Sequence, residues 1–238
     1  MKNSLVPKNM KAIIKRIPII GDLVRRAYWR LVSPKHLPRQ FPGSQRYWEN
    51  RYATGGNSGV GSYEEFADFK AEIVNRFITE KDVQSVIELG CGDGNQLMLL
   101  KCPKYLGFDI SETTVNKCRR LFAFDSTKTF GLMYNYAGQV ADLILSLDVI
   151  YHLVEDQVFE DYMRTLFMVS NRYVIIYSSD FDDNSGHEGA HVRHRKFSEW
   201  IQHNLPNWKL LKHIPNRYSY KGDCKKGSFA DFFIYEKA

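Results

Sequence analysis

Short apolar runs alternate with segments of helical periodicity through most of the chain. The runs predict strands over Val86–Leu89, Tyr105–Asp109, Thr129–Tyr134, Ala141–Leu147 and Tyr173–Ser178. The segments between them predict helices over Asn95–Lys101, Glu112–Phe122 (capped by Ser111) and Val158–Ser170. Because the apolar runs show little polar alternation, they indicate a parallel sheet that helices cover on both faces.

The two ends of this pattern complete the predicted fold. Ser62–Glu65 has the spacing of a capping box, and apolar residues keep a helical period from Tyr63 to Phe77. Trp208–Ile214 and Phe229–Tyr235 have no helix between them and predict an antiparallel pair at the sheet edge. The expected fold is therefore α/β: a doubly wound, seven-stranded, mostly parallel sheet with a C-terminal antiparallel hairpin.

Composition excludes several classes of protein. The 238 residues are 44% hydrophobic, which is enough for a packed core and excludes a disordered chain. No uncharged apolar stretch reaches the ~18 residues of a membrane span. The four cysteines show no CxxC spacing, so they predict free thiols in a reducing, cytoplasmic compartment.

Charge divides the chain into two predicted parts, a basic amphipathic leader with a proline-rich linker (1–43) and a domain (44–238). Residues 1–46 hold 11 Lys/Arg and one acid, whereas residues 47–238 hold 22 Lys/Arg and 26 acids. A helix running from Asp22 to about Val32 would place apolar residues on one face and arginines off it, as at a membrane surface. We therefore predict peripheral membrane contact through residues 1–35. Docking on the chain's own domain and nucleic-acid binding are the alternatives, and the acidic body argues against the second.

The sharpest chemical signal is the segment Glu88-Leu89-Gly90-Cys91-Gly92-Asp93-Gly94, which follows the first predicted strand. Glycines there allow a tight turn and close approach of a ligand to the backbone. Asn95 stands where a dinucleotide site has its third glycine, and Glu88 would repel a pyrophosphate but suit an amino group or positive charge. Asp109 ends the second strand, where a carboxylate can accept both hydroxyls of a ribose.

These residues resemble the motifs of class I S-adenosylmethionine (SAM)-dependent methyltransferases. Ser146–Leu153 is similar to the segment after the fourth strand of that family. The resemblance implies that SAM is the cofactor, and it implies the following contacts: Glu88, Gly90, Cys91, Gly92, Asp109, Ile110, Leu147 and Asp148. The region Phe122–Tyr136 departs from the family pattern, so the adenine contact stays unassigned.

A closer resemblance is to a bacterial methyltransferase group found with, or fused to, glycosyltransferases of cell-surface polysaccharide synthesis. Arg46–Tyr52, Gly59–Tyr63 and His191–Arg195 carry it. The resemblance implies that Trp48 and Arg51 fold over the cofactor, with Arg51 pairing with the SAM carboxylate and an aromatic ring facing the sulfonium. Ordinary helix packing is the alternative for this segment.

His152 and Asp148 are the candidate catalytic residues, because both follow the fourth strand at the edge where ligands bind in such sheets. An oxygen acceptor must lose its proton, and a histidine that titrates near neutrality suits that role. His152 is therefore the predicted general base, with a histidine that only packs beside the cofactor as the alternative.

A second cluster follows the fifth strand, and it predicts acceptor binding. It contains His187, His191, Arg193, His194 and Arg195. The predicted substrate-binding residues are His191, Arg193 and His194 of this cluster, together with Tyr151 after the fourth strand. A solvated loop is the alternative. Metal binding by Asp182, Asp183, His187 and His191 is a further one, but their spacing fits no closed zinc site, so no metal is predicted.

Together these observations predict an O-methyltransferase that acts on a sugar or glycan intermediate at the cytoplasmic membrane face, with a glycosyltransferase as a candidate partner. A methyltransferase of a diffusible small molecule and a non-catalytic SAM-binding partner of a glycosyltransferase are alternatives. The last alternative function is methylation of RNA or protein. The turn Asp148–Tyr151 lacks the Asn/Asp-Pro-Pro-aromatic pattern of amino-directed nucleic-acid enzymes, so a nucleic-acid substrate is not expected.

Overall fold

The computed structural model describes residues 41–185 and 189–238. The predicted leader helix that begins at Asp22, the expected membrane contact of residues 1–35 and His187 all lie outside the described residues. Among the helices that are described, none has the length and apolar character needed to cross a membrane.

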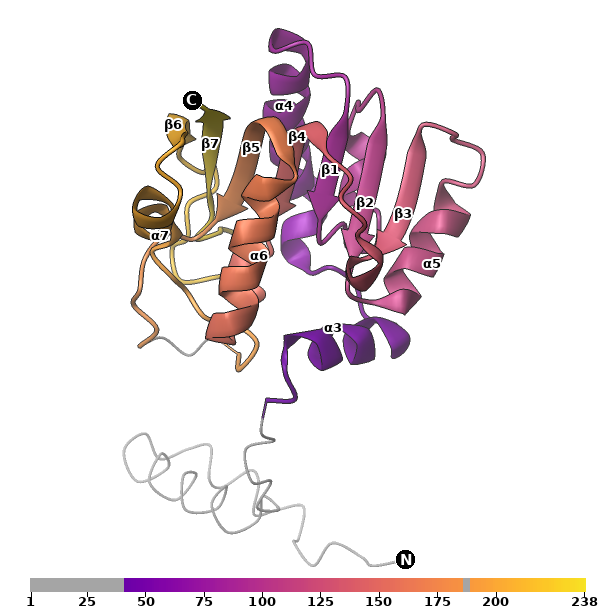
Figure 1. Ribbon diagram of the computed structural model, residues 1–238. Coiled ribbons are helices and arrows are strands. Elements are labelled where there is room, and N and C mark those ends of the chain that lie inside the picture. Colours follow the sequence, from indigo (N-terminus) through magenta and orange to yellow (C-terminus); the bar gives the residue numbers. More distant parts are fainter. Residues whose placement is uncertain (1–40, 186–188) are drawn as a thin grey trace, which may run out of the picture. The chain divides into compact units, whose positions relative to one another are not determined.

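Seven strands form one sheet in the order β3-β2-β1-β4-β5-β7-β6 (Figure 1). Strands β1 to β5 pair in parallel, whereas β7 is antiparallel to both β5 and β6. The predicted doubly wound sheet with a C-terminal antiparallel hairpin is confirmed. The strands are β1 (Val86–Leu89), β2 (Tyr105–Asp109), β3 (Lys128–Leu132), β4 (Ala141–Leu147), β5 (Ser170–Ser178), β6 (Trp208–Ile214) and β7 (Asp231–Lys237).

Helices cover both faces of this sheet, and each face has its own apolar core. The helices α4 (Glu64–Glu80) and α5 (Glu112–Leu121) pack on one face, together with side chains such as Val86 of β1. The helices α6 (Asp156–Met168) and α7 (Phe197–Asn204) pack on the other, with Ile87 of the same strand. Adjacent residues of β1 thus point to opposite cores, which explains why the strand is apolar without alternation.

The strand order reverses between β1 and β4, so the chain continues from these two strands toward opposite faces of the sheet, and a ligand can bind at the carboxyl edge between them. Helix α3 (Ser44–Ala53) lies across this edge (Figure 1). Short 3₁₀ turns complete the edge and its surroundings: η2 (Val60–Ser62), η3 (Gln96–Leu99), η4 (Met133–Asn135) and η5 (Ile150–His152).

Two local predictions are wrong, and one helix was not predicted. The capping box does not form, because Ser62 belongs to η2 and α4 begins at Glu64, preceded by Tyr63 without a side-chain cap. The segment Asn95–Lys101 makes only the 3₁₀ turn η3, since it is a short bridge between the glycine loop and β2. Helix α7 begins two residues after the polar cluster that ends at Arg195, in a segment where the sequence predicted no element.

Candidate active site

The loop after β1 turns sharply because its glycines take conformations that other residues avoid. Gly90 has φ +87° and Gly92 has φ +58°. A Cβ atom at Gly90 would lie 2.6 Å from Cγ2 of Val149, which follows β4. The loops after β1 and β4 therefore approach each other closely only because position 90 has no side chain.

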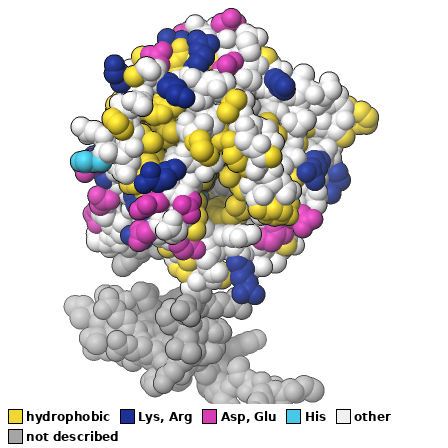
Figure 2. Space-filling view, in the orientation of Figure 1, with side chains coloured by type: hydrophobic (Ala, Val, Ile, Leu, Met, Phe, Trp, Pro, Cys, Tyr) yellow, Lys and Arg dark blue, Asp and Glu magenta, His cyan; other side chains and the backbone are white. Residues whose placement is uncertain are grey.

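A pocket lies at this junction and contains about 830 Å³ of empty space, open solvent at its mouth included. Figure 2 shows this face hollowed between groups of hydrophobic side chains. Strand-end loops, α3 and α4 all contribute to the pocket wall. Its described lining residues are Ser44, Trp48, Tyr52, Ser58, Ser62, Lys70, Glu88, Gly90, Cys91, Gly92, Asp93, Gln96, Asp109, Ile110, Met133, Leu147, Asp148, Val149, His152, Leu153 and Tyr162.

Asp109 ends β2 on the pocket wall, and the backbone around it fixes its carboxylate. One oxygen accepts a hydrogen bond from the backbone N–H of Gly92 and the other from that of Ser111, each at 2.9 Å. Burial raises the pKa of Asp109 to about 6, although these backbone bonds act in the opposite direction. Each oxygen keeps a further acceptor position, so a pair of ligand hydroxyls could bind there.

Glu88 is a second buried carboxyl group, in the middle of the sheet on β1. The hydroxyl of Tyr105 donates a hydrogen bond to it at 2.5 Å. Burial raises the pKa of Glu88 to about 7, while the Tyr105 bond and the charge of Lys70 lower it. Because this pKa lies near neutrality, a nearby cation would draw the group to its ionised form.

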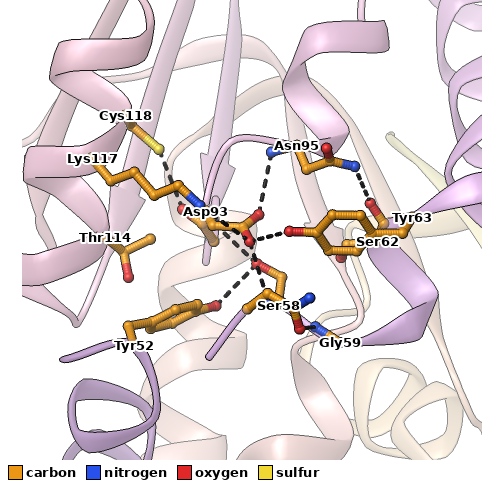
Figure 3. Close-up of polar contacts among 12 residues, drawn as sticks. Tyr52, Ser58, Gly59, Ser62, Tyr63, Asp93, Asn95, Thr114, Lys117 and Cys118 are labelled. Atoms are coloured by element: carbon orange, nitrogen blue, oxygen red, sulfur yellow. Dashed lines mark hydrogen bonds and ion pairs between the residues drawn. The ribbon is translucent and has the colours of Figure 1, made fainter. Parts of the chain in front are cut away.

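A cap formed by residues 44–63 is tied to the glycine loop through Asp93 (Figure 3). Asp93 accepts hydrogen bonds from the Tyr63 hydroxyl at 2.5 Å and the Ser58 backbone N–H at 3.3 Å. In return, the Ser58 hydroxyl accepts the backbone N–H of Asp93 at 2.9 Å. The side-chain amide of Asn95 donates to the Ser62 carbonyl at 2.6 Å.

The ionised form of Asp93 is stabilised by its neighbours although its side chain is buried. Burial by itself would raise the pKa of Asp93, but hydrogen bonds from Tyr63 and Asn95 and the positive charge of Lys117 outweigh it, so the pKa is lowered. The other end of the cap is held by a second carboxylate, because the backbone N–H of Ser44 donates to Glu155 at 2.8 Å. The cap is thus attached at both sides of the pocket.

His152 lines the pocket at the end of η5, with its ring between aromatic neighbours. The ring of His191 stacks on it at 5.3 Å between centroids, and Trp48 meets it edge-on at 4.7 Å. Nδ1 of His152 lies 3.0 Å from the backbone carbonyl oxygen of His191. Since a carbonyl oxygen only accepts, Nδ1 carries the proton and Nε2 keeps its lone pair. Burial lowers the pKa of His152 to about 4, so the ring is neutral at pH 7.

Asp148 precedes η5 with φ +60°, in the left-handed region that few residues other than glycine adopt. Its two carboxylate oxygens already have partners. Oδ2 pairs with the ammonium of Lys70 at 2.5 Å, and Oδ1 accepts the Tyr151 hydroxyl at 2.7 Å. This arrangement fixes the start of the turn that carries His152.

Residues 63–221 match the family model described as a methyltransferase domain. The chain belongs to this methyltransferase family. SAM is the methyl donor of the family and hence the cofactor of this chain. No curated protein is similar enough in sequence to count as a match.

Solved structures of other methyltransferases share the fold. The N-methyltransferase NodS from Bradyrhizobium japonicum WM9, crystallised with S-adenosylhomocysteine (SAH), aligns with a TM-score of 0.64 and 11% identity over 82% of this chain and 98% of its own. Magnesium protoporphyrin IX methyltransferase from Synechocystis PCC 6803, with bound SAM, aligns with a TM-score of 0.54 and 15% identity, over 91% of this chain and 96% of its own. The methyltransferase domain of bacterial CtHen1-C aligns with a TM-score of 0.55 and 16% identity, over 71% of this chain and 96% of its own.

The methyltransferase pocket fits a SAM molecule in three respects. Asp109 offers carboxylate oxygens for ribose hydroxyls, and Gly90 and Gly92 leave the backbone bare beside it. Glu88 offers a carboxyl group whose ionised form a nearby cationic amino group would stabilise. Met133, on the turn after β3, supplies apolar wall in the region where the sequence left the adenine contact unassigned.

The structure brings most of the predicted site residues together. The predicted residues on the pocket wall are Trp48, Glu88, Gly90, Cys91, Gly92, Asp109, Ile110, Leu147, Asp148 and His152. Arg51 is not among the lining residues. Its Nε donates to the Asn57 carbonyl at 2.7 Å, and its guanidinium lies 5.5 Å from the Trp48 ring centroid.

The predicted acceptor residues are not among the residues that line this pocket, and Arg193 and His194 line a neighbouring one. Tyr151 donates to Asp148, and His191 stacks between Tyr47 and His152. Arg193 donates to the Val154 carbonyl and pairs with Asp156, each at 2.9 Å. His194 is buried and hydrogen-bonded to Ser179 at 2.7 Å. None of the four lines the pocket beside the glycine loop, and the expectation that they bind the acceptor stays a prediction.

Sequence reasoning overlooked Lys70, Ser58 and Tyr52, which all line the pocket. A signal existed for Lys70, since it lies four residues after Phe66 and three before Ile73 on the apolar stripe of α4. The sequence around Ser58 and Tyr52 contains no such signal, because both residues contact the glycine loop, which lies far from them along the chain.

Within residues 41–185 and 189–238, no group of three histidine, cysteine or acidic side chains is arranged to hold a metal ion.

Proposed function

We propose that this methyltransferase transfers the methyl group to a hydroxyl oxygen of a sugar or glycan intermediate, with His152 as the general base. The observation that carries the proposal is the bond between Nδ1 of His152 and the His191 carbonyl. It leaves Nε2 of a pocket-lining imidazole without a proton and able to accept one from an acceptor hydroxyl.

SAM supplies an electrophilic methyl group when bound. The chain's own residues have three tasks: to hold the donor, to keep water out and to remove the acceptor proton. Asp109 and Glu88 serve the first task. Trp48 and Tyr52 of the cap serve the second, because they add aromatic surface above the strand ends.

The low pKa of His152 determines when the proton moves. A base of pKa about 4 does not deprotonate a free alcohol, but the hydroxyl proton becomes strongly acidic as the oxygen gains a methyl group. Proton transfer to Nε2 therefore accompanies methyl transfer instead of preceding it. Activity that needs neutral His152 should fall only as pH drops toward about 4, and not near neutrality as the sequence alone suggested.

Asp148 is a weaker candidate for the base than the sequence implied. Both of its oxygens have partners, the Lys70 ammonium and the Tyr151 hydroxyl. We assign Asp148 to positioning the turn that carries His152, and Tyr151 and His191 to supporting the same turn and ring. Arg193 and His194 then shape the loop that holds His191, since the Arg193 backbone N–H donates to the Tyr151 carbonyl at 2.8 Å.

The sugar or glycan acceptor, the membrane-face location and a glycosyltransferase partner form the finer part of the proposal. Their support is the resemblance of Arg46–Tyr52, Gly59–Tyr63 and His191–Arg195 to the glycosyltransferase-associated group, and the basic excess within residues 1–46. Basic residues attract anionic lipid headgroups. Such a location would bring the enzyme to acceptors assembled at the membrane.

The test compares the wild-type enzyme with His152→Ala and His152→Gln. Each is incubated with methyl-labelled SAM and fractionated cell extract, and the labelled product is identified by mass spectrometry. We expect label on a sugar oxygen, with turnover lowered by ~10²–10⁴-fold in both variants. Calorimetry with SAM is the control, because neither variant should lose cofactor affinity. Label on nitrogen or on a macromolecule without sugar, or normal turnover in His152→Ala, would contradict the proposal.

A further inference from the structure

We propose that Lys70 binds the carboxylate of the amino-acid end of SAM. This role was expected of Arg51, which the structure places off the pocket wall. The inference rests on SAM as the cofactor and does not depend on the identity of the acceptor.

Lys70 is an unusual residue for the interior of α4. Its side chain has no exposed surface, although α4 packs on the sheet through an otherwise apolar stripe. Burial of an ammonium group is costly unless anionic partners surround it. A methionine or leucine would fill the same space at lower cost, so the charge itself calls for an explanation.

The charges on the pocket wall supply that explanation. Four carboxyl groups line the pocket, those of Glu88, Asp93, Asp109 and Asp148. Of the lysine and arginine side chains that the structure describes, Lys70 alone lies on the wall. SAM has one anionic group, its carboxylate, and that group would be repelled by the acidic wall everywhere except near Lys70.

The ammonium of Lys70 also retains the capacity for a second acceptor. It has three N–H donors, and among the described residues its one hydrogen-bond partner is Asp148, at 2.5 Å. The ring of Tyr177, 5.3 Å from Nζ, borders the group on another side. A ligand carboxylate can take a donor without breaking the Lys70–Asp148 pair once the neighbouring wall shifts enough to expose Nζ, which has no exposed surface before the ligand binds.

The position of Lys70 matches the chemistry of an amino acid. Glu88 and Lys70 both line the pocket, on the face of the sheet that α4 covers, and the charge of Lys70 acts on the pKa of Glu88. The amino and carboxylate groups of SAM are bonded to one carbon atom, so their protein partners must also be close together. Glu88 for the amino group and Lys70 for the carboxylate satisfy this requirement.

Calorimetry with two ligands isolates the carboxylate. One ligand is SAH, and the other is its decarboxylated analogue S-adenosyl-3-thiopropylamine, which keeps the amino group. We expect the wild-type chain to prefer SAH by about 10- to 100-fold, as for a hydrogen bond between charged groups. Lys70→Met should remove this preference by weakening SAH binding while leaving the affinity for the analogue nearly unchanged.

Further variants keep the test decisive. Lys70→Met leaves Asp148 buried without its cation, so the Lys70→Met/Asp148→Asn double variant repeats the test without an unpaired charge; asparagine tolerates the left-handed backbone at 148. Arg76→Met, which removes an exposed cation from the same helix, is the matched control and should keep the preference. Retention of the preference in both Lys70 variants, equal weakening of both ligands, or loss of the preference in Arg51→Met alone would overturn the inference.

Discussion

Two buried carboxyl groups near the pocket show how burial prepares a residue for its ligand. Glu88 has its pKa raised to about 7 and Asp109 to about 6, in both cases mainly because water is excluded. Each group takes up a proton more easily in the folded chain than in the unfolded one. A cation beside Glu88 or hydroxyl donors beside Asp109 would favour the charged forms again, so ligand binding and ionisation are linked.

Replacement of Glu88 by glutamine should change how stability depends on pH. In the folded chain the pKa is about 7, against an ordinary value of 4.5. Between these values the folded state keeps a proton that the unfolded state loses, so the free energy of unfolding falls as pH rises through this window. Denaturant unfolding from about pH 5 to about pH 8 should show this fall in the wild type, by at most about 1.4 kcal/mol per pH unit from this group.

Glu88→Gln is well matched to the wild type, because its side-chain oxygen can still accept the Tyr105 hydroxyl. The contribution of Asp109, which has the same sign, remains in both proteins and cancels in the comparison. Parallel stability curves for the two proteins would show that Glu88 does not titrate in this window.

At the scale of elements, the central feature is the cap over the strand ends. The cap is attached to the body of the domain through carboxylates at both ends. Glu155 accepts from Ser44 at one end, and Asp93 accepts from Ser58 and Tyr63 at the other (Figure 3). Because Trp48 and Tyr52 of this cap line the pocket, we expect a ligand to enter or leave more easily when one attachment opens.

Asp93→Asn should loosen the cap at the glycine-loop end. The substitution keeps the shape of the side chain but removes the charge that accepts from Tyr63 and Ser58. Charge-assisted hydrogen bonds contribute more than neutral ones, so we expect SAH to dissociate on the order of 10-fold faster. Stopped-flow fluorescence of Trp48 measures this rate. Asp125→Asn, a surface substitution, serves as the control, and an unchanged rate in Asp93→Asn would count against the cap as a barrier.

The sequence predicted the elements whose signal is local. Apolar runs predicted the strands, and the spacing of Glu88 and Asp109 placed two carboxylates at one edge of the sheet, because parallel strands end there together. The N-cap at Ser111 was also predicted, and its hydroxyl accepts the Thr114 backbone N–H at 3.2 Å.

Features that depend on distant contacts could not be predicted in this way. Asn95 looked only like a departure from a dinucleotide motif, yet it bonds to Ser62, which lies 33 residues away in the chain. Ser62 in turn looked like a helix cap but belongs to the turn held by that bond. Arg51 was assigned to the cofactor by resemblance but does not line the pocket, whereas Lys70, a lysine inside the apolar stripe of α4, does.

At the scale of the whole molecule, charge is unevenly distributed along the chain. The excess of basic residues lies within residues 1–46, and residues 47–238 have more acids than bases. Apart from Ser44, the residues that line the pocket belong to the second part. On this basis we propose two tasks, membrane location for the leader and chemistry for the domain.

Deletion of residues 1–35 should separate these two tasks. SAM affinity, measured by calorimetry, should stay the same, while sedimentation with anionic vesicles at low salt should be lost. The reason is that each basic residue near such a surface contributes on the order of 1 kcal/mol. Vesicle binding that survives the deletion would place the membrane contact elsewhere, and a truncated chain that no longer folds would favour the docked leader.

The most direct test of the account is calorimetry of the full chain and of Asp109→Ala with SAM and NAD. The account predicts that SAM binds and NAD does not, since Glu88 repels a pyrophosphate and Asn95 occupies the place of the third glycine. Asp109→Ala should weaken SAM binding by about 1–3 kcal/mol, because the ribose hydroxyls lose a charged acceptor. Tight binding of NAD without SAM, or full SAM affinity in Asp109→Ala, would contradict it.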